Sequence, residues 1–199
     1  MQLQTGAHDP AHDFLHLQRV VRMAKILCQG EGANWAVVMP AAWLHDFVVI
    51  PKDDLRRSQA SKISAVSALE YLKKIQYPES HFPQIRHAIE AHSFSAGIEA
   101  CSLEAQVVQD ADRLDALGAI GIARCFATAG LLKREFYESK DPFCKIRPTN
   151  DKKYTLDHFY QKLFPMAKDL KTATGRKEAD RRIQTMKIFI EALTQELPL

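Results

Sequence analysis

The sequence predicts an all-α protein built as one irregular helical bundle, and three observations support this class. Apolar residues recur at spacings of three and four in nearly every segment, which is the period of a buried helix face. No run alternates apolar and polar residues as a half-buried strand does. The chain has 199 residues, 46% of them hydrophobic and 26% charged, so it can bury a sizeable core. We therefore expect residues 1–199 to form a single domain.

The first half of the chain predicts four helices, each with a recognisable end signal. The first begins at Asp13, a residue type favoured at helix N-termini, and closes at Gly30 and Gly32. The second contains Pro40, which predicts either a kink or a helix start there. The fourth begins at Pro83, because proline suits the first helical position. We expect these helices at about 13–28, 34–49, 58–75 and 83–92.

The second half predicts three further helices and one long loop. A helix over about 102–130 contains Gly118 and Gly121, which favour the close approach of another helix. Residues 133–153 are aromatic, charged and proline-bearing without any period. Because unstructured segments of this length in a compact domain are usually functional or disordered, we expect a loop or lid there. The last two helices are expected at about 156–170 and 176–197.

Composition and charge exclude several classes of protein. Apolar runs are far shorter than the roughly 18 to 20 residues of a membrane span, and the N-terminus lacks signal-peptide features, so we expect a cytoplasmic protein without membrane contact. The four cysteines form no CxxC pair, which argues against a zinc knuckle or a disulfide framework. A net charge of +3 is too small to predict duplex nucleic-acid binding. A small anionic substrate is compatible with it.

A few polar residues stand on helix faces that should be apolar. They are His16, the adjacent pair His45 and Asp46, and Asp112. A polar group buried without a partner costs of order 2–7 kcal/mol, so something should compensate these four. Two imidazoles and two carboxylates suit a divalent transition metal. A lone buried histidine is more often a satisfied core residue, and the His-Asp pair at 12–13 shows that the dipeptide alone is weak, so the hypothesis rests on the combination.

Several segments resemble the HD-domain metal-dependent phosphohydrolases. The matching segments are HDFLHLQRV (12–20), AAWLHDFVV (41–49), IEAHSFSAG (89–97) and VVQDADRLDALGAIGIAR (107–124). They are most similar to the bacterial YedJ-like branch, and to a relative described as a nucleotide pyrophosphohydrolase. The resemblance extends over nearly the whole chain, and it implies a helical bundle of the HD-domain type.

The resemblance implies a specific set of metal ligands. These are His16, His45, Asp46 and Asp112, which would bind one divalent ion drawn from Mn, Mg, Fe(II), Co, Ni or Zn. In the family such an ion lowers the pKa of its water and polarises a phosphoryl oxygen. Asp46 and Asp112 are therefore expected to be essential for catalysis. Asp115, one turn further along, is expected beside the ion's ligands or as an acceptor from a metal-held water.

His92 is a further catalytic candidate, for substrate contact or for protonation of the leaving group. It continues an apolar helix face, and histidine titrates near neutral pH. A core histidine that bonds a carbonyl is an equally weighted alternative. Since it is the one inward histidine of its region, we expect one ion rather than two. Residues 47–50 are apolar where many relatives place acids, so the general base is not identified.

Recognition of phosphate requires cations, and the sequence offers two groups of them. Arg56 follows the His-Asp helix. The loop over 133–153 contains seven basic and four acidic residues, and its best candidates for a lid over a triphosphate are Arg147 and Lys152. His158 is a weaker candidate of the same kind. For each of these residues a solvated charged face is the alternative.

Together, the residues and the resemblance predict a divalent-metal-dependent phosphohydrolase of phosphate esters or anhydrides, with nucleotides as substrates. A sharper version is a pyrophosphohydrolase that cleaves a nucleoside triphosphate between its α and β phosphates. The superfamily also contains phosphodiesterases and nucleotidases, and fold alone does not choose among them. The missing acids after the His-Asp pair motivate a different alternative, a non-catalytic metal- or nucleotide-binding domain.

Overall fold

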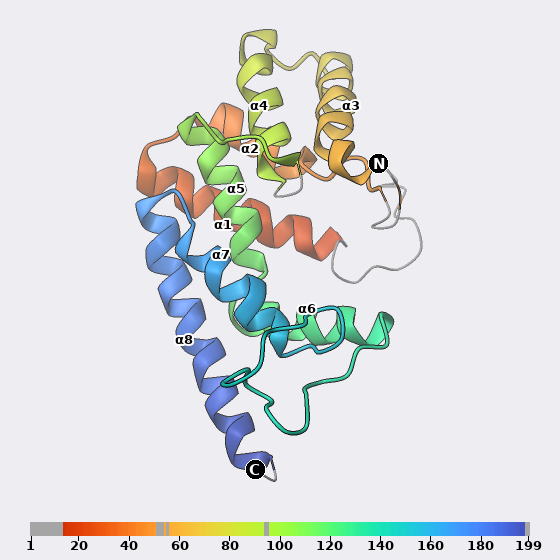
Figure 1. The fold of residues 1–199 in the computed structure, drawn as a ribbon. Helices are drawn as coiled ribbons and strands as arrows, with labels where there is room; N and C mark the ends of the chain where they lie inside the picture. The colour runs from red at the N-terminus through yellow and green to blue at the C-terminus, as the bar shows by residue number, and fades with distance from the viewer. Residues whose placement is uncertain (1–13, 51–53, 55, 94–95, 198–199) are drawn as a thin grey trace. The chain divides into compact units, whose positions relative to one another are not determined.

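The computed structural model of the protein is helical, which confirms the predicted all-α class (Figure 1). It describes residues 14–50, 54, 56–93 and 96–197, so the predicted N-cap Asp13 lies outside the described residues. Within this part of the chain, β-structure is limited to one isolated bridge between Glu135 and Tyr154. The chain divides into two compact units, the described parts of His12–Asp112 with Lys171–Gly175, and of Arg113–Leu170 with Arg176–Leu199.

The first unit is a helical bundle around α2. Helix α2 is apolar on all sides and most of its residues are buried, as expected for a helix at the centre of a unit. It packs against α1 and α4, and α4 also packs against α3. The helices of this unit are α1 Phe14–Glu31, α2 Trp35–Leu44, α3 Ala60–Lys74, α4 Phe82–His92 and most of α5 Leu103–Asp115. Short 3-10 turns precede α3 and α4, at Arg57–Gln59 and Glu79–His81.

The start of α2 agrees with the expected helix over 34–49, and its end does not. The helix begins behind Asn34, whose side chain accepts a hydrogen bond from the amide of Ala36, so the alternative of a helix start at Pro40 is wrong. It ends at Leu44 and not near residue 49. The reason is that Ser64 of α3 takes over both backbone groups of Val48, with its Oγ 3.1 Å from the nitrogen and 3.1 Å from the oxygen. A backbone satisfied in this way does not need helical partners.

The predicted helix over 102–130 is two helices, α5 and α6, the latter spanning Gly118–Leu131. Gly118 has a φ of +71°, a left-handed conformation that glycine adopts without steric cost. A side chain at Gly121 would overlap the carbonyl of Ala116. Both glycines therefore serve the break between the helices. Among the described residues no single helix is long and apolar enough to cross a membrane, and the bent pair α5 and α6 meets that length and composition criterion only jointly.

In the second unit, aromatic residues gather around the fully buried Phe159, from half-buried Phe126 and Phe189 to Phe136, which is 61% exposed. The ring of Phe126 from α6 lies 5.2 Å from that of Phe136 and 5.9 Å from that of Phe189 of α8, which spans Ala173–Glu196. Phe159 lies 6.1 Å from Phe189, measured between ring centroids. The predicted helix over 156–170 is a π-helical turn, Phe159–Leu163, followed by α7, Phe164–Lys168. The loop between α6 and this turn is irregular, as expected (Figure 1).

A buried carboxylate joins α5 to the start of α8 within the first unit. The spacing of three residues on one helix predicts an exposed ion pair between Asp110 and Arg113, and this prediction is wrong. Asp110 is fully buried and accepts hydrogen bonds from the amides of Lys171 and Thr172 at 3.0 and 2.7 Å, and from the Thr172 hydroxyl at 2.7 Å. Arg113 instead contacts Asp169, at 3.0 Å. The partners of Asp110 lie about 60 residues further along the sequence, so the spacing of residues within α5 could not predict these hydrogen bonds.

Gly175 in this junction predicts a destabilising substitution. In a Gly175→Ala variant the new Cβ would lie 2.5 Å from Oγ1 of Thr172 and 2.7 Å from Oδ2 of Asp110. Because neither atom can withdraw without losing its hydrogen bond, we expect a loss of about 1–3 kcal/mol in the free energy of unfolding by urea. Gly130→Ala is the matched control, since its Cβ would meet nothing within 4 Å. Equal stability of the two variants would contradict this packing argument.

Candidate metal centre

His45 lies directly after the last residue of α2, in the first unit. It is fully buried, and its Nδ1 lies 2.9 Å from the carbonyl oxygen of Ala42. A carbonyl can only accept, so Nδ1 carries the proton and Nε2 of the neutral ring presents a lone pair. Nε2 is buried and has no hydrogen-bond partner among the described residues. A buried imidazole nitrogen thus lies directly behind α2, and a cation or a proton would stabilise its lone pair.

Carboxylates and a second imidazole surround that nitrogen. Nε2 of His45 is 3.7 Å from Oδ2 of Asp46 and 3.7 Å from Oδ1 of Asp112. His16, which is buried in α1, places its Nε2 3.4 Å from the same oxygen of Asp112. Three segments that are distant in the sequence therefore bring the four expected ligands into one cluster.

His92 joins the cluster from the last residue of α4. It is buried, and its Nδ1 lies 2.6 Å from the carbonyl oxygen of Ile89, so this nitrogen also acts as the donor. Its Nε2 lies 3.5 Å from Oδ1 of Asp46, and its ring centroid lies 4.8 Å from that of His45. The ring thus bonds a carbonyl on one side and faces the cluster on the other, and a role in catalysis or substrate contact stays a prediction.

The donor atoms of this cluster suit a divalent cation. They form two overlapping sets, within each of which all donor atoms lie within 4.8 Å of one another: His16, His45 and Asp112, and His45, Asp46 and His92. Metal bonds to imidazole and carboxylate measure about 2.0–2.2 Å, so two donors to one ion lie about 3–4 Å apart. The measured separations of 3.4–3.7 Å fall in this range. Acceptor atoms that face one another in this way are stabilised by a positive charge between them.

Burial and the charges of neighbouring side chains shift the pKa values of the cluster residues. Burial lowers the pKa of His45, against the opposing effect of the nearby carboxylates. Burial also acts to lower the pKa of His92, but its contact with Asp46 and the charges of Asp46 and Asp112 outweigh burial, so this pKa is raised. Burial acts to raise the pKa of Asp112, and the contact with His16 and the other imidazoles lowers it well below the ordinary value. The carboxylate of Asp112 is thus held in the ionised form that binds metal.

Asp115 has a different environment from the metal-binding candidates. It is buried, and Arg124 of α6 places Nη1 2.5 Å from its Oδ2, within the second unit. Neither metal-binding set contains it. The sequence analysis did not predict a role for Arg124. Its position in the segment 107–124, which resembles the family, was the one indication, because the break before α6 separates Arg124 from Asp115.

The expected phosphate-binding residues are distributed over both units. Arg56 is exposed and pairs with Asp54 at 2.8 Å. In the second unit, Lys152 is exposed and Nδ1 of His158 lies 2.9 Å from Oδ2 of Asp151. A role in substrate binding stays a prediction for all of these residues.

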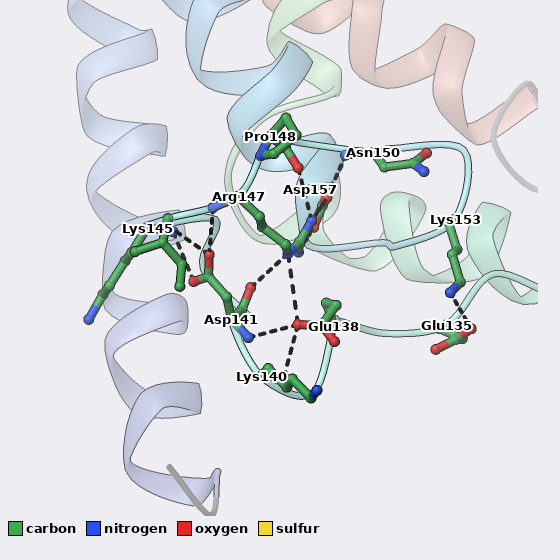
Figure 2. A network of polar contacts seen from close by, with 11 residues as sticks. Glu135, Glu138, Lys140, Asp141, Lys145, Arg147, Pro148, Asn150, Lys153 and Asp157 are labelled. Atoms are coloured by element: carbon green, nitrogen blue, oxygen red, sulfur yellow. Dashed lines mark hydrogen bonds and ion pairs between the residues drawn. The ribbon is translucent and has the colours of Figure 1, made fainter.

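Arg147 is held inside the loop by its own hydrogen bonds (Figure 2). Its guanidinium nitrogens contact both carboxylate oxygens of Asp157 at 2.6 and 2.7 Å, and its Nε donates to the carbonyl of Asp141 at 3.1 Å. The carboxylate of Asp141 accepts three further bonds from the backbone amides of 145–147. Most donors of Arg147 therefore organise the loop, and contact with substrate stays a prediction.

The family described as HD domain matches residues 14–117. This range is more than half of the chain and contains every residue of the cluster, so the chain belongs to the HD domain family. HD domains bind divalent metal ions, and the His and Asp groups found here are able to hold one.

Solved structures support the same assignment. A HD-superfamily hydrolase from Bacillus thuringiensis is 34% identical, with a TM-score of 0.72 over 93% of this chain and 86% of that one. YpgQ of Bacillus subtilis, an uncharacterized protein, is 29% identical over 191 residues, which cover 94% of this chain and 85% of YpgQ. The structure of YpgQ in complex with ADP aligns with a TM-score of 0.74 over 94% of this chain and 91% of that chain. The likeness to the Bacillus thuringiensis protein supports a hydrolase of the HD superfamily.

Proposed function

We propose that this protein is a divalent-metal-dependent phosphohydrolase that acts on nucleotides. The observation that supports this most directly is the approach of imidazole lone pairs to carboxylate oxygens. Nε2 of His45 faces Asp46 and Asp112 at 3.7 Å, an arrangement that a divalent cation stabilises. Membership of the HD domain family supports the hydrolase assignment.

We assign His16, His45, Asp46 and Asp112 as the ligands of a single ion. The two overlapping sets share Nε2 of His45, and this nitrogen has one lone pair and so can bind only one ion. When bound, such an ion lowers the pKa of a coordinated water and polarises a phosphoryl oxygen. Four protein ligands leave two positions of an octahedron open, which is what a water and a substrate oxygen together require.

His92 is assigned to the substrate side of the site. A fifth protein ligand would leave only one open position, so the reaction is better served if this imidazole handles a proton or contacts a phosphate. Its Nδ1 is engaged with Ile89, so only Nε2 can perform this role. Protonation of the leaving oxygen by such a group typically contributes 10²–10⁴-fold to the rate.

Nucleotide substrates are supported by two observations. YpgQ, which is 29% identical, was crystallised in complex with ADP. The loop over 133–153 has more basic than acidic residues, and exposed Lys152 is its best candidate for a phosphate contact. Cleavage of a nucleoside triphosphate to the monophosphate and pyrophosphate is the specific reaction that we propose.

A panel of nucleotides tests this function. The metal-free protein, reloaded in turn with Mn²⁺, Mg²⁺, Co²⁺ or Fe²⁺, is incubated with nucleoside mono-, di- and triphosphates, and phosphate and pyrophosphate are measured separately. We expect pyrophosphate from triphosphates and loss of the product on addition of EDTA. Nucleotide binding with no product under any metal would instead favour the non-catalytic alternative. Release of inorganic phosphate without pyrophosphate would favour a nucleotidase.

A further inference from the structure

Gln109 makes a buried hydrogen bond beside the metal-binding cluster. It lies on α5, its side chain is 4% exposed, and its Nε2 donates to the carbonyl of Ala91 at 2.7 Å. Ala91 is fully buried and directly precedes His92. This hydrogen bond therefore joins α5 to α4 at the residue that precedes His92, a member of the cluster.

The hydrogen bond satisfies a backbone carbonyl at the buried C-terminal end of α4. The last four carbonyls of any helix have no partner within that helix. In α4, which ends at His92, the ring of His92 bonds the carbonyl of Ile89 and Gln109 bonds that of Ala91. The first bond sets the rotation of the ring on its helix, and the second sets the position of the helix end against α5.

Gln109 and Asp112 are three residues apart on one helix, so they share a face one turn apart. We infer that Gln109 is a positioning residue, which holds His92 in register with Asp112 by tying the end of α4 to the turn of α5 that precedes this carboxylate. The inference rests on the proposed function only for the role of His92, because the register itself is a property of the metal-free protein.

The second polar atom of this amide argues against a role limited to stability. Oε1 of Gln109 is buried and has no hydrogen-bond partner among the described residues. Leaving such an acceptor unsatisfied costs about 1–3 kcal/mol, while one hydrogen bond contributes only about 1. An apolar side chain of similar length would avoid that cost but would leave the buried carbonyl of Ala91 without this partner, at a cost of the same order. The net contribution of Gln109 to stability is therefore small, which leaves the position of the helix end as what its hydrogen bond fixes.

Gln109→Met tests the inference, because it keeps the length of the side chain and removes both polar atoms. Gln106→Met is the matched control: its Nε2 donates to the carbonyl of Ala100 at 3.1 Å from the same helix, away from the cluster. In the metal-free proteins, the ring ¹⁵N and Hε1 resonances of His92 are recorded by NMR and assigned with a His92→Asn variant. Gln109→Leu is examined in the same way if the methionine variant does not fold.

We expect the His92 resonances to move or broaden in Gln109→Met and to stay in place in Gln106→Met, with similar unfolding midpoints for the two variants. The metal-loaded Gln109 variant should lose about tenfold in kcat with little change in KM, as for other groups that orient a functional side chain. Unmoved His92 resonances, or the same movement in both variants, would overturn the inference. Because the NMR comparison uses no nucleotide, it stands even if the panel shows no hydrolysis.

Discussion

Asp46→Ala is expected to weaken metal binding strongly and to abolish hydrolysis. Asp46 supplies one oxygen that faces His45 at 3.7 Å and another that faces His92 at 3.5 Å. Its removal deletes a proposed ligand together with a negative charge between two imidazoles. Loss of residues that merely orient ligands costs 10–100-fold in metal affinity, so loss of a ligand should weaken Mn²⁺ binding by at least about 100-fold. Calorimetric titration of Mn²⁺ and metal analysis of the purified protein measure this.

Asp54→Ala is the matched control for this prediction. Asp54 lies in the same part of the chain, but it pairs with the exposed Arg56 and belongs to neither metal-binding set. We expect its metal content to equal that of the unmodified protein. Asp46→Asn keeps the volume of the side chain and removes its charge, so a loss of metal in this variant as well would assign the effect to ligation rather than to packing. Full metal stoichiometry in Asp46→Ala would overturn the ligand assignment.

Asp157→Ala is expected to destabilise the second unit strongly. Asp157 is fully buried and accepts bonds from two guanidinium nitrogens of Arg147 and from the amide of Asn150, at 2.6–2.7 Å (Figure 2). Removing one partner of a buried ion pair leaves the other charge uncompensated and costs about 3–5 kcal/mol. Chemical unfolding and limited proteolysis within the loop report this loss. Glu135→Ala, which breaks an exposed pair with Lys153, should cost at most about 1 kcal/mol.

The same ion pair predicts how stability depends on pH. Burial acts to raise the pKa of Asp157, but its hydrogen bonds with Arg147 and Asn150 outweigh burial and lower it. An aspartate with a lowered pKa contributes stability above its unfolded pKa of about 3.9, and this contribution is lost as the pH falls through the folded pKa. We therefore expect the unmodified protein to lose stability below about pH 4 more steeply than Asp157→Asn does. Parallel pH profiles for the two proteins would contradict this role.

The sequence predicts most helices because burial imposes a regular spacing, and it fails where a distant partner decides. The stripe that includes Leu17, Val20 and Leu27 is buried in α1 as expected. The end of α2 is set instead by Ser64, which bonds both backbone groups of Val48 from another helix. No property of the residues near Val48 announces such a contact, so the periodic pattern extended the predicted helix too far.

The candidate site also has residues that the sequence predicts and residues that it does not. Its imidazoles and carboxylates stand out because polar residues interrupt apolar helix faces, and this signal singled out His92 as well as the expected ligands. Arg124 and Gln109 were missed because arginine and glutamine are ordinary on helix surfaces. Their importance appears only when Arg124 is seen against Asp115, and Gln109 against the end of α4.

The cluster also has a consequence for folding. It joins α1, the end of α2 and the last turn of α5, and these segments lie far apart along the chain. An ion bound there closes long chain loops, which removes conformational freedom from the unfolded chain much as a crosslink does. Binding to the native state alone adds about 2.7 kcal/mol of stability at a hundredfold excess over the dissociation constant. A bound metal would thus stabilise the fold in the way a crosslink does. The concentration of metal would then affect the amount of folded protein as well as its activity.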